Sequence, residues 1–348
     1  MKKKIVSIIA PFADGRKETG GQIVVAREYR EYFQNKVDNI SVRFVDTFKA
    51  QPIKMFIRSV WLICRSDIVL IILSSNGLRL YLPMIYYLNK IFKRKIFHRV
   101  IGNMISEDIR KYPSYIKCLN SFEMNYVEGV MQAEKLKTLG IKCIQSISNF
   151  RSIGILTERD ISVYERRPYI YCTYSRVHSA KGITTAINGI IEINRKMGHI
   201  AAKLHVFGMI DDNYKVEFDE LVKKADGTVI YKGVANPKES IKILRQYYML
   251  LFPSVWEGEG FSGTLIEALA AGLPVISSNW SMNTEIIEDG YTGLVYDYRN
   301  NEDFIRCLDI SVRNQDLIEG MRVNCIHEAV KYTPDKVMRL MLERMYLK

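Results

Sequence analysis

Short apolar runs alternate with amphipathic stretches along the whole chain. In the first 150 residues the apolar runs predict strands at 4–10, 42–46, 68–73, 96–101, 125–127 and 144–147. Between them, helical spacing of apolar residues predicts helices at 21–33, 53–65, 80–92 and 130–139. Strands that alternate with helices favour a parallel sheet covered by helices.

A second series of the same kind follows a stretch without periodicity. Residues 149–167 are rich in charge and predict a linker that ends at Pro168. Strands are then predicted at 169–174, 203–207, 228–231, 249–252, 274–277 and 294–296, with helices between them and up to the end of the chain. We therefore predict an α/β protein of two doubly wound, Rossmann-like domains, 1–165 and 168–332, which face each other across a ligand-binding cleft.

The positive charge of the chain is concentrated in its first half. The formal net charge is +12, and residues 1–150 hold 25 Lys and Arg against 12 Asp and Glu. Two predicted helical stretches, 53–65 and 79–95, mix bases with large apolar side chains, which predicts contact with an anionic membrane surface. The alternative is a pair of helices that pack on the sheet and leave a basic face in water. Nucleic acid is disfavoured as a partner because the chain carries no recognition motif for it.

Other features narrow the class further. The apolar part of the first ten residues is too short for a signal peptide, and no apolar run can span a bilayer as a single helix, so we expect a cytoplasmic, peripheral protein. The six cysteines and five histidines have no metal-ligand spacing, which predicts no protein-bound metal.

The most informative segment runs from residue 253 to 276. A buried strand leads into a glycine-rich turn and then a helix, an arrangement whose free backbone N–H groups favour a phosphate; the residues expected to line it are Gly260, Phe261, Ser262, Gly263 and Thr264. Two acids flank the turn, Glu259 before the helix and Glu267 inside it. Carboxylates suit sugar hydroxyls, so a nucleotide sugar fits between them. The alternative is an ordinary helix start with acids near its positive end.

Other loops supply cations and glycines. Arg176 and Lys181 follow the first strand of the second domain, where two cations would neutralise a diphosphate leaving group. Glycines that permit close approach of a ligand are expected after other strands; these positions are Gly208, Gly233 with Val234, and the pair Gly20 and Gly21. Each of these also has a purely structural interpretation, as a tight turn or a surface lysine. The glycines do not form the dinucleotide fingerprint, so a nicotinamide enzyme is disfavoured.

Together these residues resemble a known family. Glu259 and Glu267 have the Glu-x7-Glu spacing of the family 4 retaining glycosyltransferases, and Arg176 to Gly182 is similar to the Arg-x4-Lys-Gly element of that family. The resemblance is to members that build bacterial surface polysaccharides, and Ser262 departs from the usual glycine. It implies a glycosyltransferase B fold, and a last helix, 333–348, that packs back on the first domain. It also implies a first domain that binds the acceptor and a second domain that binds the donor.

We therefore expect a retaining glycosyltransferase that passes a sugar from a nucleotide diphosphate sugar to a lipid-linked saccharide. In this interpretation Arg176 and Lys181 hold the diphosphate, Glu267 holds the ribose and Glu259 contacts the sugar. At the end of the predicted strand 96–101, where relatives carry a His or Asp, the sequence reads Ile101-Gly102-Asn103, so no side-chain base is assigned there. Two alternatives are a nucleotide-sugar epimerase of the same fold and a non-catalytic binding protein.

Overall fold

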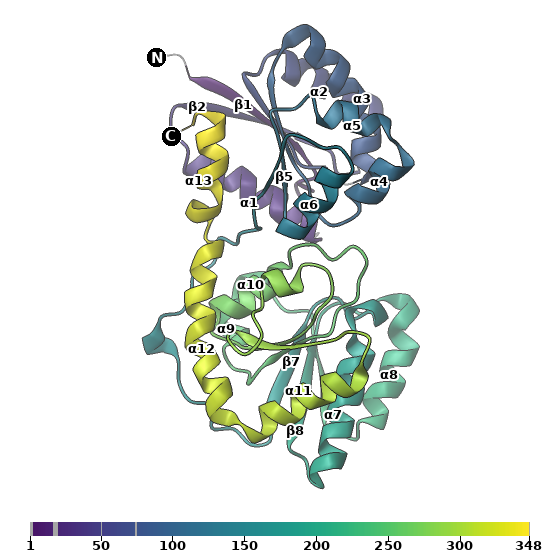
Figure 1. Cartoon of the computed structure of the whole chain (residues 1–348), viewed down its shortest axis with the longest axis vertical. Helices are drawn as coiled ribbons and strands as arrows, with labels where there is room; N and C mark the ends of the chain where they lie inside the picture. The colour runs from purple at the N-terminus through teal and green to yellow at the C-terminus, as the bar shows by residue number, and fades with distance from the viewer. Residues whose placement is uncertain (1–2, 17–19, 50, 74, 348) are drawn as a thin grey trace. The chain divides into compact units, whose positions relative to one another are not determined.

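The computed structural model describes residues 3–16, 20–49, 51–73 and 75–347 and divides into two compact units (Figure 1). Unit 1 consists of Met1–Phe150 and Pro334–Lys348, and unit 2 of Arg151–Thr333. Residues 151–167, which sequence analysis assigned to a linker, group with unit 2. Both units are doubly wound α/β folds, and the predicted fold class is confirmed at this level.

The sheet of unit 1 contains six parallel strands in the order β2-β1-β3-β4-β5-β6. Their bounds are β1 (Lys4–Ala10), β2 (Ile40–Asp46), β3 (Ile68–Ile71), β4 (Lys95–Arg99), β5 (Met124–Val127) and β6 (Ile144–Ser146). The central strands β1 and β3 are apolar on both faces, because helices cover the sheet on either side. Strand β2 forms one edge, and its side chains are mostly half-buried.

Two sets of helices cover the two faces of this sheet. The helices are α1 (Gly21–Asn35), α2 (Pro52–Cys64), α3 (Ser75–Phe92), α4 (Ile105–Lys111), α5 (Ser114–Leu119), α6 (Val130–Thr138) and α13 (Pro334–Met345). Successive side chains of a strand point to opposite faces. Accordingly Ile68 and Leu70 share a core with α1 and α13, whereas Val69 and Ile71 share one with α2 to α6.

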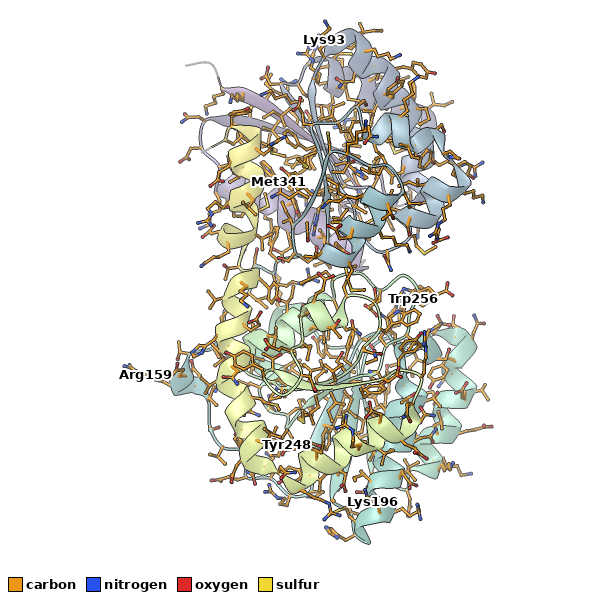
Figure 2. All side chains as sticks on the ribbon, viewed as in Figure 1. Lys93, Arg159, Lys196, Tyr248, Trp256 and Met341 are labelled. Carbon is orange, nitrogen blue, oxygen red and sulfur yellow. The ribbon has the colours of Figure 1, made fainter. Side chains whose placement is uncertain are left out.

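Helix α13 belongs to unit 1 although it comes from the other end of the chain (Figure 1). It buries Val337, Met338, Met341 and Met345 in the core that contains α1, and Figure 2 labels Met341 in this position. At its end, Lys4 Nζ donates to the Tyr346 carbonyl oxygen at 2.9 Å, which joins the two ends of the described chain.

The sheet of unit 2 also has six parallel strands, in the order β12-β11-β10-β7-β8-β9. Their bounds are β7 (Tyr169–Tyr174), β8 (Ala202–Phe207), β9 (Val229–Gly233), β10 (Leu250–Phe252), β11 (Val275–Ser278) and β12 (Gly293–Tyr296). The direction in which strands are added reverses between β7 and β10. In doubly wound sheets such a switch point is where ligands bind, beyond the carboxyl ends of the strands.

The helices of unit 2 are α7 (Ile183–Met197), α8 (Lys215–Lys224), α9 (Ser240–Leu244), α10 (Gly263–Ala270), α11 (Asn301–Arg313) and α12 (Gln315–Ala329). Helices α7, α8 and α11 share one core, and α9 and α10 share the other, while α12 contributes to both. The loop after β7 leads into α7 on one face of the sheet, and the loop after β10 leads into α10 on the other face. In the described part of the chain, every helix is too short or too polar to cross a lipid bilayer.

Candidate active site

Two loops meet at the carboxyl ends of β7 and β10. One follows β7 and contains the 3₁₀ turn Ser179–Lys181, and the other follows β10 and leads into α10. The backbone N–H of Val255 donates to the carbonyl oxygen of Ala180 at 2.9 Å. Thr264 Oγ1, in the first turn of α10, donates to the carbonyl oxygen of Tyr174 at 3.1 Å. These bonds hold both loops and the start of α10 in one cluster.

Lys181 and Glu259 form an ion pair in this cluster. Lys181 Nζ lies 2.6 Å from Glu259 Oε2, and the side chains are 14% and 8% exposed. The Ser254 hydroxyl donates to the same carboxylate oxygen, and Ser281 Oγ donates to the Glu259 carbonyl oxygen at 2.8 Å. A nearly buried pair is retained only where further hydrogen bonds satisfy it, so Glu259 is held in one orientation.

A glycine makes the close packing of the two loops possible. Gly182 has a φ of +72°, and a Cβ on it would lie 2.1 Å from the carbonyl oxygen of Pro253. Any side chain here would collide with backbone and would also occupy the left-handed region that favours glycine. The sequence Lys181-Gly182 therefore brings the lysine to the end of β10 as well as to the end of β7.

Helix α10 directs its N-terminus into the same cluster. Ser262 is its N-cap residue, with φ −68° and ψ 120°, and no described side chain caps the first turn. The first N–H groups of a helix have no partner inside it, so those of Gly263 and Thr264 are suited to bind an anion. Phe261 is buried against Tyr332, with ring centroids 5.5 Å apart. A ligand would thus meet the backbone of the turn that contains Gly260 and Phe261.

Glu267 pairs with a residue that sequence analysis did not select. Arg151 Nε lies 3.3 Å from Glu267 Oε1, and the two side chains are 10% and 16% exposed. A Cβ on Gly263 would lie 1.6 Å from Arg151 Nη2, so the guanidinium occupies the space that the glycine leaves open. Arg151 was missed because it lies in the segment predicted to be a linker.

Aromatic side chains border the cluster. Burial, with the nearby Glu267 carboxylate, raises the pKa of Tyr174 to about 12, so its phenol stays neutral at physiological pH. Trp256, labelled in Figure 2, lies on the loop after β10, and its ring centroid is 5.8 Å from the exposed Arg176 guanidinium. His178 packs edge-on against Trp256, and Trp280 Nε1 donates to the Trp256 carbonyl oxygen at 2.8 Å. Trp256 was not predicted, since no motif marks it.

The other predicted glycines of unit 2 lie along the same edge of the sheet. Gly208 has a φ of +136°, and a Cβ on it would lie 1.7 Å from the carbonyl oxygen of Ser175. Its N–H donates to the Gly233 carbonyl oxygen at 2.9 Å, and the next residue, Val234, is exposed. Gly20 and Gly21 belong to unit 1, where they are exposed at the start of α1.

Unit 1 has a buried polar network at the carboxyl ends of β4, β5 and β6. The fully buried Arg99 donates to the Ile147 carbonyl oxygen at 2.6 Å and to Asn149 Oδ1 at 2.7 Å. Asn149 Nδ2 donates to Glu128 Oε1 at 2.8 Å, and Glu128 Oε2 accepts the Gly102 N–H at 3.1 Å. The network holds the turn at Gly102 and the half-buried Asn103.

His98 lies one residue before Arg99 and is fully buried, as expected for a packed histidine. Its Nδ1 lies 3.1 Å from Asn125 Oδ1, an acceptor, so Nδ1 carries the proton. Across the described ranges, no three His, Cys, Asp or Glu side chains gather closely enough to hold a metal ion.

Comparison with known proteins identifies the class. The sequence model of the family Glycosyl transferases group 1 matches residues 156–331, about half of the chain, and the chain belongs to this family. The HepE structure of Anabaena, in complex with UDP, superposes with a TM-score of 0.78 at 12% identity, covering 99% of each chain. The fold is thus the glycosyltransferase B fold.

Two curated relatives are similar over part of their length. An uncharacterized 41.2 kDa protein in the cps region of Klebsiella pneumoniae is 30% identical over 105 residues, 30% of this chain and 28% of that protein. The GtfA subunit of the UDP-N-acetylglucosamine–peptide N-acetylglucosaminyltransferase of Streptococcus pneumoniae is 30% identical over 145 residues, 41% of this chain and 26% of that protein. The chain thus spans about a quarter of the length of these two relatives.

Proposed function

We propose that this protein transfers a sugar from a nucleotide diphosphate sugar to a saccharide acceptor. The observation that carries the proposal is the Lys181–Glu259 pair beside the uncapped N-terminus of α10, at the switch point of the unit 2 sheet. A cation and free N–H groups suit the diphosphate, and a fixed carboxylate suits the hydroxyls of the donor sugar. UDP is our choice of nucleotide, because HepE binds it and the GtfA relative uses a UDP-sugar.

In the proposed site each residue has one task. The Lys181 ammonium has three N–H donors. One remains paired with Glu259, and the others donate hydrogen bonds to the diphosphate. Arg176 is exposed beside Trp256, free to close on the phosphates. Glu267, oriented by Arg151, accepts hydrogen bonds from the ribose hydroxyls. The backbone near Gly208, Gly233 and Val234 borders the base. In unit 1, the exposed backbone of Gly20 and Gly21 permits close approach of a ligand.

The proposed reaction retains the anomeric configuration. The bond from the anomeric carbon to the diphosphate oxygen breaks, and the acceptor hydroxyl oxygen forms the new bond on the same face. The acceptor proton passes to the departing phosphate oxygen, so no side-chain base is needed. Arg176, Lys181 and the N–H groups of α10 stabilise the charge that develops on the leaving group, so no metal ion is part of this mechanism.

The acceptor that we propose is a lipid-linked saccharide of a bacterial surface polysaccharide, used at the inner face of the membrane. Two observations support it: the relative from a cps region, and the excess of basic residues in the first 150 residues.

Replacement of Arg176 tests the proposed leaving-group contact. In a transfer assay with a UDP-sugar, Arg176→Ala should lower kcat by about 10²–10³, the loss that follows removal of one preorganised charge-stabilising donor. Arg195→Ala, an exposed arginine near the far end of α7, is the matched control and should keep its rate. Unchanged turnover by Arg176→Ala, with the fold intact, would remove Arg176 from the mechanism.

The same assay distinguishes transfer from epimerisation. Incubation with UDP-sugars and no acceptor should leave the sugar configuration unchanged. Interconversion of free UDP-sugars would instead establish an epimerase of this fold.

A further inference from the structure

The outer faces of α2 and α3 expose an unusual amount of apolar surface. On α2, Ile53, Ile57 and Trp61 recur every four residues and are 78%, 63% and 45% exposed. On α3, Tyr87 and Ile91 are 65% and 73% exposed. The two helices are neighbours on one face of the unit 1 sheet, and Ser59 Oγ of α2 donates to Tyr81 Oη of α3 at 3.2 Å. The exposed apolar side chains Ile53, Ile57 and Trp61 of α2 and Tyr87 and Ile91 of α3 are together called here the α2–α3 stripe.

The same two helices and the residues next to them expose many bases. These are Lys54, Arg58, Arg65, Arg79, Lys90 and Lys93. Figure 2 labels Lys93, just beyond the end of α3. Between Asp46 and Glu107 the sequence contains a single acid, Asp67, which accepts the Ile5 N–H at the start of β3. Apolar side chains between bases match an anionic bilayer, into which the apolar groups insert while the bases contact phosphates.

A cavity of about 420 Å³ lies beside the stripe, lined by residues of α1, β2, α2 and the loop after β1. Its lining includes Arg30, Arg43, Arg58 and Trp61, so Trp61 belongs to the cavity and to the stripe. The Arg43 guanidinium is 5.5 Å from the Trp61 ring centroid, and its Nη1 is buried with no hydrogen-bond partner among the described residues. A buried N–H of a cation without an acceptor is costly, which indicates that the cavity receives one.

The two carboxylates of the cavity are already engaged. Asp14 accepts two hydrogen bonds from Arg30 Nη1, at 2.7 and 2.8 Å. Asp46 accepts four backbone N–H groups, from Phe12, Ala13, Asp14 and Phe48. In the described part of the chain neither carboxylate pairs with Arg43 or Arg58, whose guanidinium groups have the fork geometry that suits phosphate oxygens.

We propose that the α2–α3 stripe docks on an anionic bilayer and that the adjoining cavity receives the phosphate of a membrane lipid between Arg43 and Arg58. This inference deepens the membrane placement in the proposed function and rests on it. Docking here would fix which surface of unit 1 lies against the lipid, independently of the donor chemistry in unit 2.

Vesicle binding by the full chain tests the phosphate site. The protein should float with vesicles of mixed phosphatidylcholine and phosphatidylglycerol, and not with phosphatidylcholine alone. Arg43→Gln/Arg58→Gln should lower the partition coefficient roughly 30-fold, from about 1 kcal/mol for each base near an anionic surface. Lys223→Gln/Lys224→Gln removes two exposed bases from α8 and should change binding less than about 3-fold. Equal losses in the two double variants would show diffuse charge attraction and overturn the phosphate site.

Quenching of tryptophan fluorescence tests whether the α2–α3 stripe inserts into the bilayer. In a Trp256→Phe/Trp280→Phe background, Trp61 is the single tryptophan, and vesicles with brominated acyl chains should quench it. Ile57→Asn/Ile91→Asn should weaken vesicle binding, whereas Val216→Asn, 72% exposed on α8, should not. Binding without quenching of Trp61 would overturn docking through this face.

Two further outcomes distinguish a lipid phosphate from free phosphate, and the docking proposal from the proposed catalytic function. Release of the protein from vesicles by inorganic phosphate at constant ionic strength would show a site for free phosphate and overturn the lipid as its source. Absence of binding to anionic vesicles, with UDP-sugar turnover intact, would overturn the docking proposal and leave the proposed catalytic function standing. Thermal unfolding of each variant controls for folding, and Arg58→Gln alone replaces the double variant if Arg43→Gln unfolds.

Discussion

Single residues decide how closely the loops of unit 2 approach each other. Gly182 and Gly263 leave the spaces in which the Pro253 carbonyl and the Arg151 guanidinium lie, and Gly208 does the same for Ser175. Two of these neighbours are backbone carbonyls, which cannot move as a flexible side chain does. The ion pairs Lys181–Glu259 and Arg151–Glu267 depend on this packing, because Gly182 directly follows Lys181 and Gly263 lies against the Arg151 guanidinium.

Two glycines with the same backbone angle allow a controlled test of that dependence. Gly182 and Gly198 both have a φ of +72°, but a Cβ on Gly198 meets nothing within 4 Å. Gly198→Ala should thus cost only the strain of the left-handed conformation, about 1 kcal/mol in the free energy of unfolding. Gly182→Ala should cost a further 1–3 kcal/mol or so from the collision with Pro253 and should lower UDP-sugar affinity as well. Equal destabilisation of the two variants in urea unfolding would contradict the close approach.

Sequence patterns predicted some residues of the ion pairs and their surroundings and missed the residues that contact them. Glu259, Glu267, Arg176 and Lys181 could be selected, because their spacing around glycine-rich turns has a chemical meaning. Arg151 lies 116 positions before Glu267 and does not directly follow a strand, so only the folded chain shows that they meet. Ser254 and Trp256 were missed for a similar reason: a serine or a tryptophan in a loop has many possible roles.

At the scale of elements, the parallel strands were predictable and the short helices were not. Strands β1 and β7 begin and end where the apolar runs do, and the others differ by one or two residues at one or both ends. Helix α5 has six residues, too few to show a helical period, and it escaped prediction. Strand β4 ends at Arg99, two residues earlier than predicted, because Gly102 begins a turn held by Glu128.

Strand β4 also makes the stability of unit 1 depend on pH. Burial, and secondarily the neighbouring Arg99 charge, lowers the pKa of His98 from 6.5 to about 4, although its hydrogen bond to Asn125 opposes the shift. His98 therefore takes up a proton near pH 6.5 in the unfolded chain, but only near pH 4 in the folded chain. Stability from this group is complete above pH 6.5 and is lost as the pH falls towards 4, by about 3 kcal/mol in total.

Hydrogen exchange of the peptides that cover β4 and β5, corrected for intrinsic rates, should show this loss as increased local opening at low pH. His98→Leu should flatten the pH dependence, whatever its effect at neutral pH. His199→Leu, at an exposed position of unit 2, should leave it unchanged. The same slope in wild type and His98→Leu would assign the acid sensitivity to other groups.

At the scale of the whole molecule, unit 1 is discontinuous in sequence and unit 2 is continuous. Residues 1–150 form the sheet of unit 1, but one of its two cores is completed by α13, from the other end of the chain. Composition and periodicity indicate a final amphipathic helix without saying which sheet it covers; that expectation came from the family resemblance alone. Substitutions in α13 are therefore expected to change the stability of the sheet and helices formed by residues 1–150.

Met341 and Leu340 offer the comparison that tests this connection. Met341 is fully buried against α1, whereas the adjacent Leu340 is 44% exposed. Met341→Ala should lower the free energy of unfolding of unit 1 by about 2–5 kcal/mol through the lost transfer energy and the remaining cavity, and Leu340→Ala by much less. Hydrogen exchange resolved by peptide should place the loss in β1, β3 and α1, with the peptides of unit 2 unchanged. Because helix α13 follows unit 2 directly in the sequence, an effect confined to residues 1–150 would arise from tertiary packing rather than from chain proximity. A loss that instead appeared in α10 or β10 would mean that the two units unfold as one.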